Sequence, residues 1–173
     1  MWCEDNHGEI EGASRTTSSF WGDNALDFDG NNDYGVVDHH SIYNVSEISI
    51  SAWINLDDND TDSRTIFSNY QQNESSRHGY RTLVNDDAKF VFRFGFGSSS
   101  GSCVSNTEIT ENNWTLVTAT YDESSIKLYI NDDESGHSMF SESSDFTTVD
   151  SISLEKIFEI SKSFEKVAPP DTG

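Results

Sequence analysis

Residues 29–33, Asp-Gly-Asn-Asn-Asp, place two carboxylates, two amides and a flexible glycine side by side. Calcium is held in proteins by about six to eight oxygens from carboxylates, amides and backbone carbonyls. The run therefore predicts a Ca²⁺ site formed by Asp29, Asn32 and Asp33. A plain tight turn is the alternative, because Asp and Asn accept turn conformations and bond their own backbone. Both interpretations stay open from the sequence.

Two further clusters contain possible metal ligands. The acidic run 57–62 is a second calcium candidate, but it is equally typical of a solvated loop. His39 and His40 are adjacent, and adjacent side chains on a strand point to opposite faces. They are therefore interpreted as two polar loop residues rather than as a metal pair.

Catalytic patterns are missing from the sequence. Retaining sugar hydrolysis needs two carboxylates about 5 Å apart, as alternate positions of one strand would place them, whereas the acidic residues here gather in turn-like runs. There is no Gly-X-Ser-X-Gly elbow, and Cys103 lies in a Ser/Gly-rich stretch, read as a loop, without a neighbouring histidine. We predict that the chain is not an enzyme.

The elements that would position any site are strands. Residues 47–56 alternate with period two, with Ile48, Ile50, Ala52, Ile54 and Leu56 on one face. Phenylalanine repeats in the same way at positions 90, 92, 94 and 96, and Ile126, Leu128 and Ile130 follow the pattern. Alternate side chains of a strand share a face, so these runs predict sheets with one face in a core.

Polar turn signals separate the runs at roughly ten-residue spacing, which is typical of an antiparallel sandwich. We predict a single domain over residues 1–173, with its core in 24–163 and loose segments at 1–23 and 164–173. The fold class is all-β, an antiparallel jelly-roll β-sandwich of two sheets.

Charge narrows the possible partners. The chain has 31 acidic and 10 basic residues and a formal charge of −21. Such a chain repels phosphate backbones and anionic lipids, so nucleic acid and membrane surfaces are not expected partners. Adaptation to salty surroundings explains the negative charge as well as a specific binding site does. No apolar run is long enough to insert into a membrane. Whether Cys3 and Cys103 form a disulfide is left open.

The motifs together resemble laminin-G-like domains of the concanavalin A-like lectin/glucanase superfamily. Residues 25–34, ALDFDGNNDY, are similar to the opening "AL-x-FDG-x-x-DY" of that family, and 48–54, ISISAWI, to its "FTISAWV" strand. Residues 113–122, NWTLVTATYD, resemble "WHHVAATYDG", and 126–131, IKLYIN, resemble "VKLYVDG". Shorter matches at 65–68 and 79–83 keep the family order. The resemblance also favours Asp29 and Asp33 as calcium ligands.

Both ends depart from the family pattern. The first strand that precedes residues 6–13 in relatives is not found, and neither is the closing strand after 157–163. These strands are neighbours in relatives, so we expect a fragment of a larger protein or a copy with an unpaired sheet edge. Unpaired edges favour association with other strands.

The resemblance implies a non-catalytic glycan-binding or adhesion module of a larger extracellular or cell-surface protein, with a carbohydrate or protein ligand. A structural or protein-interaction domain is the alternative, and a remnant of a polysaccharide-active enzyme is the least favoured. Among aromatic residues, Trp53 is expected in the second layer of the sandwich, while Tyr70, Tyr80 and Tyr129 lie at or near strand ends. No sugar-binding residue is selected by the sequence.

Overall fold

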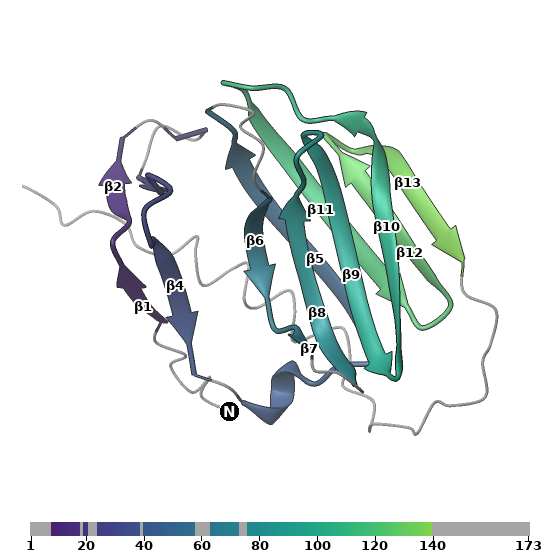
Figure 1. The fold of residues 1–173 in the computed structure, drawn as a ribbon. Helices are drawn as coiled ribbons and strands as arrows, with labels where there is room; N and C mark the ends of the chain where they lie inside the picture. Colours follow the sequence, from purple (N-terminus) through teal and green to yellow (C-terminus); the bar gives the residue numbers. More distant parts are fainter. Residues whose placement is uncertain are drawn as a thin grey trace, which may run out of the picture.

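The computed structural model of the protein describes residues 8–17, 19–20, 24–38, 40–57, 63–72 and 76–139 (Figure 1). This part of the chain contains 13 β-strands and one short 3₁₀ helix, η1. The first half holds β1 (Gly8–Glu11), β2 (Ser14–Thr16), β3 (Ala25–Asp27), β4 (Tyr34–Val37), η1 (Ser41–Tyr43), β5 (Glu47–Asn55), β6 (Arg64–Ser68) and β7 (Gln71–Gln72). The second half holds β8 (Arg77–Val84), β9 (Lys89–Gly97), β10 (Ser99–Glu108), β11 (Trp114–Asp122), β12 (Ser125–Ile130) and β13 (Asp133–Met139).

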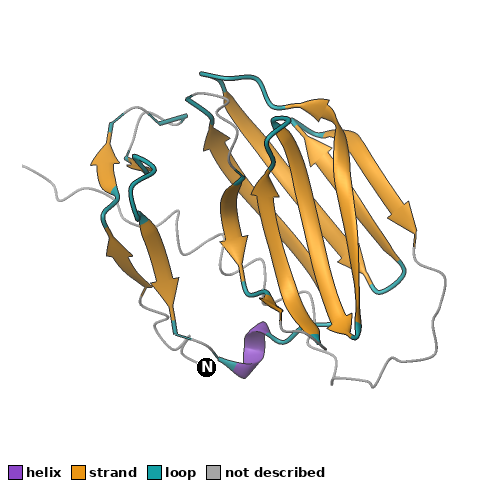
Figure 2. Cartoon of the chain, viewed as in Figure 1, coloured by secondary structure: helices purple, strands orange, loops and turns teal. Residues whose placement is uncertain are grey.

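Two antiparallel sheets form the body of the protein (Figure 2). Sheet I has the order β10-β9-β8-β6, with β7 paired to β8, and sheet II has the order β13-β12-β11-β5. The sheets pack face to face, since the Phe94 ring of β9 lies 4.2 Å from the Tyr121 ring of β11. The predicted all-β sandwich of two antiparallel sheets is confirmed. No helix among the described residues could cross a membrane.

The core consists of the faces that period two predicts. Its buried apolar side chains form one cluster: Ile48, Leu56, Tyr80, Val84, Ala88, Phe90, Phe92, Phe94, Cys103, Ile109, Val117, Ala119, Tyr121, Ile126, Leu128 and Ile130. Phe92 and Leu128 are fully buried, one in each sheet. Burying each such side chain stabilises the fold by about 1.5–3 kcal/mol.

One edge of the sandwich is closed by two strands that the sequence analysis missed, β10 and β13. The Thr107 backbone N–H donates to Ser135 Oγ at 3.0 Å, and Ser138 Oγ donates to the Ser102 carbonyl at 3.3 Å. Gly136 permits this contact, because a Cβ atom there would lie 2.9 Å from the Val104 carbonyl oxygen. The sheets therefore meet along β10 and β13.

The N-terminal strands differ from the prediction that residues 1–23 form a loose segment. There β1 pairs with β4, and β2 pairs with β3, as two separate ribbons. Apolar side chains of the ribbons stay exposed, with Ile10 at 47% and Val36 at 46%. The predicted strand 157–163 lies outside the described residues.

Candidate functional site

The acidic loop 29–33 uses its carboxylates to hold its own backbone. Asp33 Oδ2 accepts a hydrogen bond from the Asp29 N–H at 2.5 Å, and Asp29 Oδ1 accepts one from the Asn31 N–H at 2.8 Å. Gly30 and Asn32 both have positive φ, 81° and 64°. The other carboxylate oxygen of Asp33, Oδ1, lies close to Gly12. A Cβ atom added to Gly12 would lie 2.0 Å from this oxygen.

These contacts commit one carboxylate oxygen of Asp29 and one of Asp33 to the backbone of the loop. The described part of the chain contains no group of three or more His, Cys, Asp or Glu side chains placed to hold a metal ion. The geometry favours the turn interpretation, while calcium at Asp29, Asn32 and Asp33 stays a prediction.

We expect equal amounts of Ca²⁺ and Mg²⁺ to raise the melting temperature of chelator-treated protein by the same amount. Either dication screens the repulsion within a chain of charge −21. Thermal unfolding followed by circular dichroism measures both shifts. A filled calcium site at 100 times its Kd would instead add about 2.7 kcal/mol with Ca²⁺ alone. Loss of that extra stability in Asp29→Ala would establish calcium at this loop.

The other candidate ligands of the sequence are only partly within the described residues. Residues 58–62 and His39 lie outside the described residues. His40 Nδ1 accepts a hydrogen bond from the Ile42 N–H at 3.2 Å and so caps η1. Cys103 is a free thiol on the inner face of β10, 3% exposed, which corrects its assignment to a loop. Burial raises the pKa of this thiol, which makes it a poor nucleophile.

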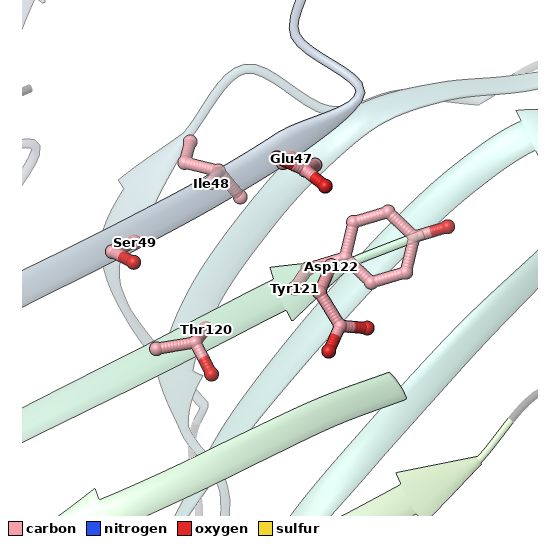
Figure 3. Close-up of a pocket in the computed structure, with 6 residues that line it drawn as sticks. All are labelled: Glu47, Ile48, Ser49, Thr120, Tyr121 and Asp122. Carbon is pink, nitrogen blue, oxygen red and sulfur yellow. The ribbon is translucent and has the colours of Figure 1, made fainter. Parts of the chain in front are cut away.

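A shallow hollow of about 270 Å³ lies where the end of β11 meets the start of β5 (Figure 3). Glu47 faces Asp122 across the strands. Burial tends to raise the pKa of Asp122, but hydrogen bonds from Ser124 and Ser125 together lower it to about 2. Burial, with help from Glu123 and Asp122, raises the pKa of Tyr121 to about 12.

Neither group suits proton transfer near neutral pH. A general acid or base works best when its pKa is near the operating pH, and these two values lie far on either side. The Asp122 carboxylate is also committed to the β11–β12 turn, where it accepts bonds from both serines. Asp122 therefore stabilises the end of β11 and the turn that follows it.

The outer face of sheet I carries a group of residues that the sequence analysis did not single out. Tyr80 and Phe94 point into the core, so their neighbours Arg81 and Arg93 point outward. Arg81 and Arg93 are directly opposite each other in the β8–β9 register, and Arg77 lies on the same face of β8. Ser102 of β10 is opposite Arg93. Counting charge separately for each predicted strand face would have revealed this cluster.

Neighbouring groups hold two of these arginines, a tyrosine ring for Arg81 and a backbone carbonyl for Arg77. The Arg81 guanidinium lies over the Tyr70 ring, 5.5 Å from its centroid. Arg77 Nη1 donates to the Ser98 carbonyl at 3.2 Å. Gly79 lets the segment before β7 approach β8, where the Asn69 N–H donates to the Tyr80 carbonyl at 2.8 Å.

Of the aromatic residues considered earlier, two differ from expectation. Trp53 lies on the outer face of β5, where its ring stacks on Phe20 at 3.8 Å, rather than between the layers. Tyr80 belongs to the core and is 4% exposed, so it cannot present its ring to a sugar. Tyr70 is the one that joins the outer face of sheet I, through Arg81.

The comparison with protein families agrees with the fold. The family model Laminin_G_3, described as the concanavalin A-like lectin/glucanases superfamily, matches residues 29–154. A crystal structure of an S-layer domain-containing protein (residues 221–444) from Clostridium thermocellum is similar, with 21% identity and a TM-score of 0.42. The similarity covers 76% of this chain and 59% of that one. No curated protein of similar sequence was found.

Proposed function

Because this chain belongs to the concanavalin A-like lectin/glucanases superfamily, we propose that it is a non-catalytic glycan-binding or adhesion module of an extracellular or cell-surface protein. The observation that carries the proposal is the outer face of sheet I. That face presents hydroxyl, amide and guanidinium groups, with Gln72, Ser100 and Ser102 exposed beside the arginines. Such groups exchange hydrogen bonds with sugar hydroxyls, so this strand surface suits a polymer lying across it.

Asp122 supports a binding role over a catalytic one. Asp122 stays ionised because its pKa is about 2, and its hydrogen bonds hold a turn. The facing Glu47 lies at the same strand end (Figure 3). Glycoside hydrolysis needs one carboxyl group with a raised pKa to protonate the leaving group. The pKa of Asp122 is lowered instead, so this carboxylate does not suit that role.

A protein ligand is the second candidate, favoured by the exposed apolar side chains of the β1–β4 ribbon. Tyr34 is 53% exposed and Val37 is 48% exposed. Contiguous exposed apolar groups are typical of protein-binding surfaces. In this case the ribbons, rather than sheet I, would hold the partner.

Affinity electrophoresis of the 173-residue protein through gels containing neutral or acidic polysaccharides tests the proposal. We expect retardation by at least one polysaccharide. Ser102→Leu, which covers the face of sheet I with an apolar side chain, should weaken it several-fold. Ser51→Leu makes the same change on the outer face of sheet II and should leave it unchanged. Unretarded migration in every gel would contradict glycan binding and favour the protein ligand.

A further inference from the structure

Positive charge is scarce in this protein and is unevenly placed. The described part of the chain holds seven basic residues: Arg15, Arg64, Arg77, Arg81, Lys89, Arg93 and Lys127. Arg77, Arg81, Lys89 and Arg93 lie at alternate positions on β8 and β9 that point away from the core. We name Arg77, Arg81 and Arg93 the arginine face.

The arginine face brings like charges together. Arg81 and Arg93 are cross-strand partners, so their Cβ atoms are about 5 Å apart. Like charges directly opposite each other destabilise a sheet. The residues that flank the pair in the register, Ser68 and Ser102, carry no charge to offset the repulsion.

Within the described ranges, none of the three arginines forms an ion pair with a carboxylate. Arg77 contacts the Ser98 carbonyl, and Arg81 contacts the Tyr70 ring. Arg81 Nε is buried without a hydrogen-bond partner. A buried donor left without an acceptor is unfavourable by about 1–3 kcal/mol. No acidic side chain within the described ranges pairs with these arginines, so an external anion is an acceptor that fits Arg81 Nε.

We propose that the arginine face binds the carboxylate or sulfate groups of an acidic polysaccharide. The inference rests on the proposed glycan-binding function and names its ligand class. Guanidinium groups form paired, parallel hydrogen bonds with such planar or multi-oxygen anions. An anion between Arg81 and Arg93 would remove their mutual repulsion and supply an acceptor to Arg81 Nε.

The overall charge of −21 does not prevent this binding. At physiological ionic strength exposed charges are screened beyond about 8 Å, so a bound anion interacts chiefly with the arginines it touches. The face is also elongated. Arg77 and Arg81 are four positions apart on β8, which is about 13 Å along a strand. A linear polymer with regularly spaced anionic groups matches this arrangement better than a single small anion.

The test measures retardation of the 173-residue protein in gels containing polygalacturonate, dextran sulfate or uncharged dextran. We expect retardation by polygalacturonate or dextran sulfate, and the stronger of the two identifies the anionic group. The double variant Arg81→Gln/Arg93→Gln should reduce affinity at least tenfold. Lys127→Gln removes one positive charge from the outer face of sheet II and should leave affinity within twofold. Raising the salt concentration should weaken binding of the unmodified protein.

Circular dichroism melts separate loss of the ligand from loss of the fold. The double variant should melt no lower than the unmodified protein, because it removes a repulsive pair. Equal affinity of the double variant and Lys127→Gln would overturn the inference. So would retardation by dextran alone, although glycan binding itself would then stand. Binding to a single-stranded oligonucleotide as tight as to either acidic polysaccharide would also overturn it. No retardation in any gel would remove the proposed function as well.

Discussion

Replacing Phe92 by alanine is expected to lower the free energy of unfolding by about 3–5 kcal/mol. Phe92 has no exposed surface and lies in the middle of β9, opposite Thr82 on β8 and Cys103 on β10. Removing its ring loses the apolar burial and leaves a cavity between the sheets, because close-packed neighbours relax only partly. Urea denaturation followed by fluorescence or circular dichroism measures the change.

Phe28→Ala is the matched control, because it deletes the same ring from a side chain that is 51% exposed. Its effect should stay under about 1 kcal/mol, as is usual for surface positions. Since a typical domain is stable by only about 5–15 kcal/mol, Phe92→Leu serves as a milder variant if Phe92→Ala does not fold. Similar losses at positions 28 and 92 would contradict the description of β9 as the centre of the core.

Gly79→Ala is expected to destabilise the protein by about 2–5 kcal/mol, from two separate causes. Gly79 has a φ of 79°, a conformation that L side chains adopt at a penalty of about 1–2 kcal/mol. A Cβ atom would also lie 1.8 Å from the Asn69 carbonyl oxygen. Asn69 is held by its own bond to the Tyr80 carbonyl, so the backbone must be pushed aside, which adds about 1–3 kcal/mol.

Gly97→Ala isolates the first cause. Gly97 has a similar φ of 68°, but no atom lies within 4 Å of the position that its Cβ would take. We expect a loss of about 1–2 kcal/mol. Both substitutions restrict the unfolded chain equally, so the difference in unfolding free energy reports the contact with Asn69. A Gly79→Ala variant no less stable than Gly97→Ala would show that no such contact exists.

The sandwich could be predicted because its central strands follow a simple rule. The phenylalanines of β9 and the isoleucines of β5 recur at every second position, and only a strand places alternate residues on one face. The edge strand β10 was not predicted, because its inward-facing residues are small. They are Gly101, Cys103 and Ser105, and they give no apolar period-two pattern. Strand β13, which lies beside β10 at this edge, begins with Asp133 and Glu134, and acidic residues of this kind are typical of a turn. The contacts between β10 and β13 join two different sheets, and a local sequence pattern does not contain this information.

The candidate site was harder to predict, for a different physical reason. The loop 29–33 attracted attention because its ligands are adjacent in sequence, yet its carboxylates bond the loop backbone. Arg81 and Arg93 are far from conspicuous in the sequence, and only the β8–β9 register places them opposite each other. The period-two pattern does assign Arg93 to the outer face of β9. Its pairing with Arg81 requires the turn between the strands to be known.

The junction between β5 and β11 has a consequence for how fast the protein folds. Strands β8 to β10 and β11 to β13 are consecutive hairpins, whose closing loops are short. By contrast, Ser51 Oγ of β5 bonds Thr118 Oγ1 of β11 across 67 residues of sequence. Such non-local pairing gives a high contact order, and domains of this kind fold in milliseconds to seconds rather than microseconds. We expect β11 to pair with its near neighbour β12 before it pairs with β5, and in that interval the open backbone groups of β11 are exposed to pairing with another chain.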